Sequence, residues 1–191
     1  MKFFKLETMG DANDTGLCFL GNNIEDLGIE DWRLLMGESM AAYFPAAAQV
    51  AMDDAHPGVK LASVIGNRHG YFIASSPLRA VIEKSCKTGI EYLPFKLLDH
   101  RKRLASKDYC LVNPLGTFSC LDEKASNIQY SKKGKAMRGG EFVLDPAKVK
   151  AAPQLFRIDK FAPEIVIGET LVGEINAAGL TNLKVTPIRV G

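Results

Sequence analysis

A pattern that occurs twice along the chain does most to limit what it can fold into. A β-rich run over residues 71–76 and another over residues 90–95 flank a short helical run, and residues 164–169 and 183–188 flank a second one. A glycine ends the helical run in both copies, as glycine often does at helix C-termini. Strands and helices in this order favour an α+β protein with a mixed, mostly antiparallel sheet, short helices and an internally duplicated strand–helix–strand unit.

The residues around the first helical run fit the preferences of helix N-termini. Ser75 or Ser76 is a good N-cap, and Pro77 suits the start of the helix because its missing N–H would be unpaired there in any case. Gly168 takes the place of the serine in the second copy. Capping accounts for the serine pair, so we do not interpret it as a catalytic nucleophile.

Length and composition are those of an ordinary globular protein. The chain has 191 residues, of which 47% are hydrophobic and 24% are charged. We expect one α+β domain over residues 1–191, with two tightly packed lobes meeting near residue 107 as the alternative. No run approaches the roughly 20 apolar residues of a membrane span, and the first residues lack the apolar stretch of a secretory signal. We therefore expect a cytoplasmic protein without a membrane partner.

The N-terminal third is the least regular part of the pattern. Residues 2–7 alternate weakly and predict an edge strand, with residues 17–20 as its neighbour. Apolar side chains at spacings of three and four predict a helix over residues 25–44, with Trp32 on its buried face. A partly exposed Trp32 would instead suit a binding hot spot. Residues 60–65 look like a single helical turn.

The middle of the chain reads as strands and basic loops. Residues 109–112 and 117–121 predict a hairpin around a turn. Residues 131–140 combine four basic side chains with three glycines but lack the spacing of a phosphate-binding P-loop, so we expect a surface loop. The basic cluster at residues 100–103 has no interleaved aromatic side chains, and we do not expect nucleic acid as a partner.

Metal, redox and cofactor chemistry find little support in the sequence. The four cysteines, Cys18, Cys86, Cys110 and Cys120, form no C-x-x-C pair and are interpreted as reduced core residues. The three histidines are dispersed and have no carboxylate or thiol at metal-ligand spacing. We expect no metal and no cofactor.

Catalytic motifs are equally scarce. The paired carboxylates Asp53–Asp54 and Asp122–Glu123 are candidates for acid–base work, but both pairs lie where a strand is expected to end, which is a usual place for surface charges. No G-x-S-x-G elbow occurs. The residues therefore predict a protein that is not an enzyme.

Charge divides the chain into two unequal parts. Residues 1–59 hold three basic against ten acidic side chains, a net charge of −7, whereas residues 60–191 hold 21 basic against 12 acidic ones, a net charge of +9. Together they give the overall +2. Such an asymmetry favours an acidic and a basic face, which affect partner choice and association rate more than the fold.

Six segments in the last two-thirds of the chain carry a family resemblance: residues 70–75, 91–94, 109–115, 120–126, 155–158 and 177–181. In this order they resemble a bacterial family of immunity proteins from polymorphic toxin systems, immunity family eleven of the myxobacterial type. Weaker likeness extends back to residues 44–45 and 60–61. Cys120 departs from the small or apolar residue expected there, and the family supplies no catalytic motif to carry over.

The resemblance implies a stoichiometric function. The protein would bind and neutralise the C-terminal toxin domain of a cognate effector, through a surface whose shape and charge fit that domain. We expect the binding surface in the acidic N-terminal third, where the candidate residues are Asp11, Asp14, Glu25, Asp26, Glu30 and Asp31. The alternative is an intracellular interaction module or self-associating scaffold with no toxin partner, for which a homodimer is one form.

Overall fold

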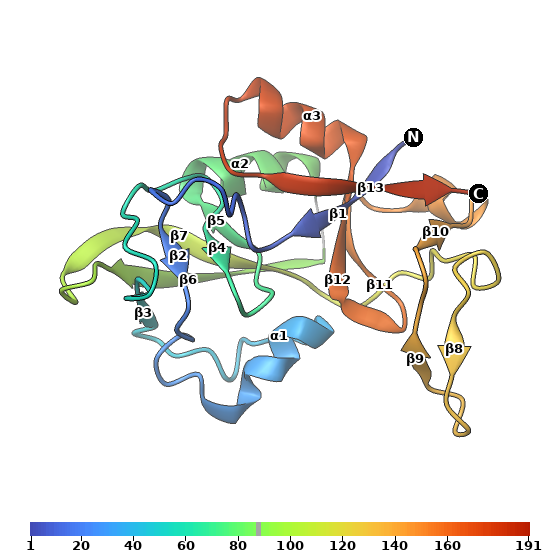
Figure 1. The fold of residues 1–191 in the computed structure, drawn as a ribbon, viewed down its shortest axis with the longest axis horizontal. Coiled ribbons are helices and arrows are strands. Elements are labelled where there is room, and N and C mark those ends of the chain that lie inside the picture. The colour runs from blue at the N-terminus through green and yellow to red at the C-terminus, as the bar shows by residue number, and fades with distance from the viewer. Residues whose placement is uncertain (87–88) are drawn as a thin grey trace.

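The larger of the two main sheets joins both ends of the chain. The computed structural model describes residues 1–86 and 89–191. Five strands lie in the order β10–β13–β1–β12–β11, and they span Val143–Leu144, Lys184–Val190, Phe3–Glu7, Phe161–Gly168 and Leu155–Ile158. β1 is central and antiparallel to both neighbours (Figure 1). The predicted edge position of residues 2–7 is therefore wrong, because the partners of this strand lie at the far end of the sequence.

The smaller sheet is built from the middle of the chain. Its order is β3–β6–β7–β5, with β3 at Gln49–Ala51, β5 at Ile73–Ser75, β6 at Ile90–Leu98 and β7 at Leu104–Pro114. β6 and β7 form a long antiparallel hairpin, and β5 pairs with the other side of β7. Residues 109–112 thus belong to a longer strand, and their predicted hairpin with residues 117–121 is wrong.

The strand–helix–strand pattern appears in both sheets with the same topology. β5, α2 (Ser76–Ser85) and β6 form the first unit, and β12, α3 (Glu169–Ala177) and β13 form the second. In each unit the two strands run parallel and are separated by one antiparallel strand, β7 in the first and β1 in the second. The predicted α+β class is confirmed, while the duplication of one unit from the other stays a prediction.

The two helices share one layer of the molecule. α2 and α3 lie side by side (Figure 1), and the hydroxyl of Ser85 donates a hydrogen bond to the Glu174 carboxylate between them. Ser75 occupies the N-cap of α2 as expected, but its hydroxyl makes no capping hydrogen bond. Ser76 Oγ instead donates to the backbone carbonyl of Asp108 at 3.2 Å. Side-chain capping therefore does not explain the serine pair.

Three apolar clusters fill the space around the sheets. Alternate residues of β7 point to opposite faces of the sheet. Leu111 packs in a cluster with side chains from residues 18–52, and Val112 packs in another with side chains of α2 and α3. Val166 of β12 contributes to the third cluster, on the far face of the larger sheet. Residue 107, the predicted meeting point of two lobes, lies inside β7, and a division into lobes stays a prediction.

The remaining elements are short. β2 (Phe19–Leu20) pairs in parallel with β4 (Gly66–Asn67) rather than with β1. β8 (Gln129–Tyr130) and β9 (Ala136–Arg138) form a small hairpin, so the expected surface loop has regular structure. The 3-10 turn η2 covers Lys148–Ala151. Residues 60–65 form no helix, and that prediction is wrong.

Candidate protein-binding site

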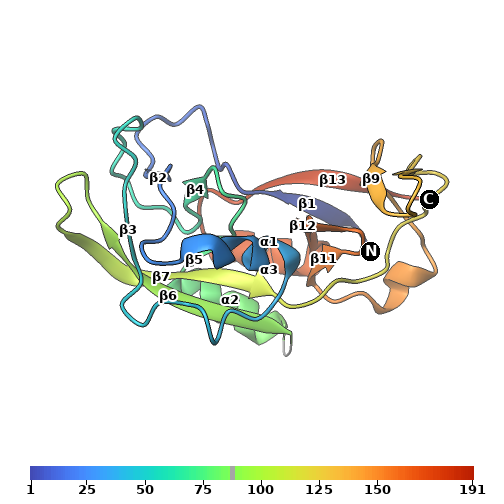
Figure 2. The ribbon, with the colours of Figure 1, turned by 90° about the horizontal axis from the view of Figure 1, so that it is seen from below.

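A short helical segment lies on the face of the smaller sheet opposite α2. It consists of the 3-10 turn η1 (Gly28–Asp31) and the helix α1 (Trp32–Met36). Figure 2 shows β6 and β7 between α1 and α2. The predicted helix over residues 25–44 is thus much too long. Gly37 ends it by adopting the left-handed conformation, with φ of 69°.

Large apolar side chains of this segment are exposed. Ile29 is 85% exposed, Trp32 47%, and Met36 and Tyr43 45% each. Helical spacing places the first three along one stripe. The expectation that Trp32 is a core residue is wrong, and the alternative of a partly exposed tryptophan holds. We call these four residues together with Arg33 the α1 patch.

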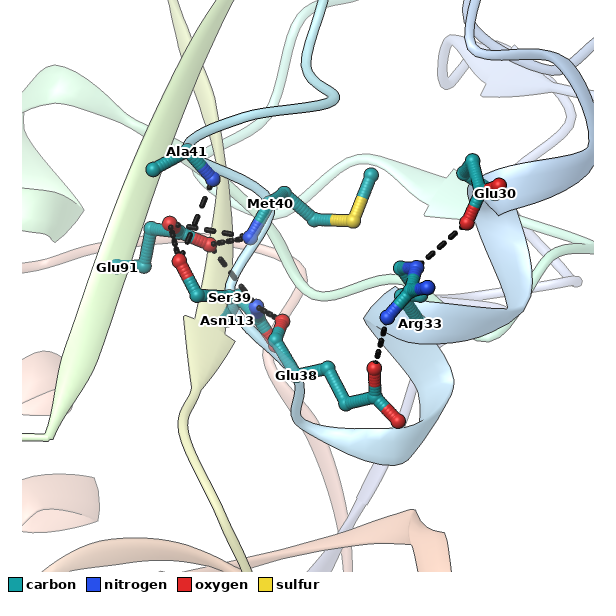
Figure 3. Close-up of polar contacts among 8 residues, drawn as sticks. All are labelled: Glu30, Arg33, Glu38, Ser39, Met40, Ala41, Glu91 and Asn113. Carbon is teal, nitrogen blue, oxygen red and sulfur yellow. Dashed lines mark hydrogen bonds and ion pairs between the residues drawn. The ribbon is translucent and has the colours of Figure 1, made fainter.

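Arg33 occupies the centre of the α1 patch. Its guanidinium lies 4.8 Å from the centre of the Trp32 ring and 4.5 Å from that of Tyr43. Arg33 Nε donates to Glu30 at 2.5 Å, and Nη1 donates to Glu38 (Figure 3). The hydrogen bond to Glu30, followed by the charges of the surrounding groups, raises the pKa of Arg33. The two glutamates and two rings therefore hold a cation in one orientation at the surface.

The chain that follows α1 is fastened to the smaller sheet by Glu91 of β6. Its carboxylate accepts hydrogen bonds from the Met40 backbone N–H and from Ser39 Oγ, both at 2.9 Å (Figure 3). Asn113 Nδ2 donates to the same carboxylate at 3.1 Å and to the Glu38 carbonyl at 2.9 Å. These bonds fix the turn that brings Tyr43 back to Arg33.

Arg157 of β11 anchors the end of α1 from below. This side chain is buried and donates to the carbonyls of Leu34 at 2.6 Å, Leu35 at 3.3 Å and Pro114 at 3.0 Å, and to Asn113 Oδ1 at 3.3 Å. Burial lowers its pKa to about 10. The last carbonyls of a helix have no partner within it, so Arg157 satisfies them and ties α1 to both main sheets.

The predicted binding residues do not form one surface. Glu25 and Asp26 precede η1, and Glu30 and Asp31 belong to it, so these four lie beside the α1 patch. Asp11 and Asp14 lie in the loop between β1 and β2, which is on the opposite side of the molecule from α1 (Figures 1 and 2).

The two groups also differ in their partners. Asp11 forms an ion pair with Lys184 at 2.8 Å, and Asp14 forms one with Lys60 at 3.2 Å. Asp31 accepts a hydrogen bond from the neutral amide of Asn23 at 2.9 Å, and Glu25 accepts one from Gln49. Lysines therefore balance the charges of the loop pair. Around α1, Arg33 balances Glu30, whereas the amides bonded to Glu25 and Asp31 leave the charges of these two carboxylates in place.

Asp53 is not the surface carboxylate that its place after a strand suggests. It is 8% exposed, and its Oδ2 accepts hydrogen bonds from His56 Nδ1 at 2.6 Å and Arg68 Nη2 at 2.8 Å. Burial alone would raise the pKa of Asp53, but the bonds from His56 and Ala55 and the charge of Arg68 outweigh it and lower that pKa. No spacing in the sequence signals this cluster.

The basic residues 100–103 are accounted for by a turn, and the low reactivity of the four cysteines is accounted for by burial. The basic residues 100–103 form the tight turn between β6 and β7, where Arg103 pairs with Asp99 at 2.8 Å. Cys18, Cys110 and Cys120 are buried as predicted and Cys86 is half-buried. Burial raises the pKa of Cys18 to about 12 and that of the other three to about 11. Reactive thiolates are therefore scarce at neutral pH.

Within residues 1–86 and 89–191, no three or more His, Cys, Asp or Glu side chains are grouped so as to hold a metal ion. None of the helices in that part of the chain has the length and apolar character needed to cross a membrane.

Comparison with known protein families gives a match over nearly the whole chain. No curated protein matches the chain. A family model described as an immunity protein family, Imm11, matches residues 2–190. The match includes the N-terminal third with the α1 patch, which the resemblance recognised in the sequence left largely uncovered.

Proposed function

The chain belongs to the Imm11 immunity protein family, and from this premise we propose that it neutralises a bacterial toxin domain by binding it through the α1 patch. Family membership implies a toxin-neutralising function in general terms. The proposal adds a surface, a mode of action and a partner chemistry. The partner is the C-terminal toxin domain of a cognate effector, met in the cytoplasm, and the mode of action is stoichiometric binding rather than catalysis.

The observation that carries the proposal is the composition and rigidity of the α1 patch. Tryptophan, tyrosine and arginine dominate the hot spots of protein interfaces, and methionine is enriched there. Trp32 and Tyr43 both contact the Arg33 guanidinium at the surface. The bonds from Glu91 and Arg157 hold their backbone in place before any partner arrives. Pre-ordering of this kind lowers the entropic cost of binding.

Charge around the patch supports a basic partner surface. Residues 25–38 contain five acidic side chains and one basic one, a net charge of −4. An acidic rim steers a basic face toward the patch and disfavours wrong partners. It also disfavours self-association, because two copies docked patch to patch would bring two acidic rims together. A toxin domain with a basic face therefore suits this surface better than a second copy of the chain.

The test is binding of the toxin domain encoded beside the gene, measured by calorimetry, together with rescue of growth on co-expression. We expect Trp32→Ala to weaken binding by about 30-fold or more, since hot-spot truncations cost about 2 kcal/mol or more. Tyr43→Ala should weaken it by about tenfold, which corresponds to about 1.4 kcal/mol. Tyr130→Ala is the matched control, because Tyr130 is 44% exposed but lies on β8.

Each possible result bears on a different part of the proposal. Wild-type binding by both α1 variants would move the interface elsewhere and leave the neutralising function intact. Failure of the wild-type protein to bind or protect against any neighbouring toxin domain would overturn the function itself. In that case light scattering on the purified protein tests the self-associating scaffold.

A further inference from the structure

A pocket lies on the side of the molecule away from the α1 patch. It is enclosed by the β1–β2 loop, by β2 and by the turn at residues 55–57, and its volume is about 220 Å³. Its walls are mainly apolar and include Met9, Leu17, Phe19, Ala55 and Pro57. Asp11 and Asp14 stand at the same loop, each already paired with a lysine.

His56 supplies the pocket with a fixed polar group. Its ring lines the pocket and packs against Phe19, with ring centres 4.4 Å apart. Its Nδ1 is bonded to Asp53, which is itself held by Arg68. In the neutral ring this arrangement puts the proton on Nδ1 and leaves Nε2 as a hydrogen-bond acceptor. Among the described residues, Nε2 has no hydrogen-bond partner.

Gly21 explains how the buried carboxylate can approach Arg68. A Cβ at this position would lie 2.3 Å from Asp53 Oδ2 and 2.7 Å from Arg68 Nη2. Glycine therefore leaves the space in which Asp53, Arg68 and His56 meet. The orientation of the imidazole is built into the fold and does not depend on a ligand.

We propose that this pocket binds a single aromatic ring that carries a hydrogen-bond donor, of which phenol is the simplest example. An apolar cavity of about 150 Å³ holds a benzene molecule, so a pocket of about 220 Å³ has room for one substituted ring and little more. The donor of the ligand pairs with His56 Nε2. A neutral donor suits the site better than an ammonium group, because Lys60 and Lys184 already compensate the nearby carboxylates.

Covalent chemistry does not follow from the same residues. Cys18 lines the pocket with His56, but burial keeps its pKa near 12 and the thiol makes no hydrogen bond to the imidazole among the described contacts. The site is thus one of binding. The ring can come from a free phenolic compound or from a tyrosine side chain of a protein partner, and both present the same chemistry.

The test is a titration of the ¹⁵N-labelled full chain, followed through its amide resonances. Phenol is expected to shift the signals of Thr15, Phe19 and Ala55 with millimolar affinity, whereas anisole, which lacks the donor, binds about tenfold more weakly. His56→Phe keeps the contact with Phe19 and reduces phenol affinity by about tenfold. His100→Phe is the control, since His100 lines a different pocket.

A second variant fills the pocket without touching its polar group. Ala12 is exposed and lines the pocket, so Ala12→Leu should abolish phenol binding while the amide spectrum stays folded. Equal binding of phenol and anisole, or no shift at these residues with phenol, overturns the proposal. N-acetyl-tyrosinamide separates the sources: its binding assigns the site to a protein side chain, and binding of phenol alone assigns it to a free compound. Neither result depends on toxin binding.

Discussion

The α1 patch and the pocket between the β1–β2 loop and residues 55–57 are both built mainly from the acidic N-terminal third, yet their side chains are arranged in opposite ways. At the patch, aromatic side chains stand outward around a cation, and residues 25–38 keep a net charge of −4. At the pocket, the aromatic and apolar side chains turn inward, and lysines from distant parts of the chain balance the carboxylates. The difference teaches that acidic residues close in sequence can serve separate surfaces, and that their partners decide which charge remains.

The largest expected effect is a loss of stability when Arg157, the anchor of the α1 patch, is replaced. Arg157→Met removes the donors to the carbonyls of Leu34 and Pro114, of which the Leu34 carbonyl keeps a longer bond of 3.4 Å from the Gly37 N–H. We expect a loss of about 2–4 kcal/mol in the free energy of unfolding, measured with urea. Arg189→Met, on the exposed side of β13, should change stability little. Some buried charges can be replaced by apolar groups without loss of stability. If Arg157→Met also leaves the free energy of unfolding unchanged, Arg157 does not anchor α1.

The next effect tests the turn that ends α1. Gly37→Ala places a Cβ 2.8 Å from Arg157 Cδ and 2.9 Å from the Gly116 carbonyl, in a backbone that also has positive φ. We expect a loss of about 2 kcal/mol or more. Gly28→Ala has a similar φ of 63° but meets nothing within 4 Å, and should cost only about 1 kcal/mol. Equal losses in the two variants would mean that the close approach has no energetic weight.

Charge reversal compares the two acidic groups directly. Glu25→Lys with Asp26→Lys should slow association with a toxin domain about tenfold at low salt, and the difference should shrink as salt rises. Asp11→Lys with Asp14→Lys should leave the association rate within about twofold, because that loop is on the opposite side. Stopped-flow measurements of the association rate compare the two double variants. A larger effect from the loop pair would reverse the assignment of the two surfaces.

The smallest effect concerns the pocket. The pKa of Asp53 is lowered in the folded protein, so its ionised form contributes stability that is present above the unfolded pKa and is lost as pH falls through the folded one, below about pH 4. Asp53→Asn should lower the free energy of unfolding by about 1 kcal/mol at neutral pH and reduce the loss of stability as the pH falls. Thermal melts from pH 7 to pH 3 test it, and an unchanged pH profile would contradict the role of the carboxylate.

Local rules predicted the elements whose residues carry their own signals. The helix after Ser75 and the strands predicted at residues 90–95 and 183–188 follow from periodicity and from the placement of proline and glycine, and all three are present. Trp32 was misplaced because a spacing of three and four says that a helix has a face, not what covers it. Gly37, visible in the sequence, was the signal that the helix ends early.

The anchoring and the pocket could not be predicted for a different reason. Arg157 reaches Leu34 over 123 residues of sequence, and Lys184 reaches Asp11 from the last strand. Such contacts depend on which strands pair, and β1 pairs with strands that no neighbouring turn connects to it. The acidic set was predicted from its clustering along the chain, so it could not separate the two loop residues from the four beside α1.

The central place of β1 has a consequence for synthesis. Its two neighbours, β12 and β13, begin at Phe161 and Lys184, so β1 gains a partner on either side only after those residues have left the ribosome. Arg157, which holds α1, is also translated late. A nascent or truncated chain that ends before Arg157 therefore lacks the contact that supports the α1 patch.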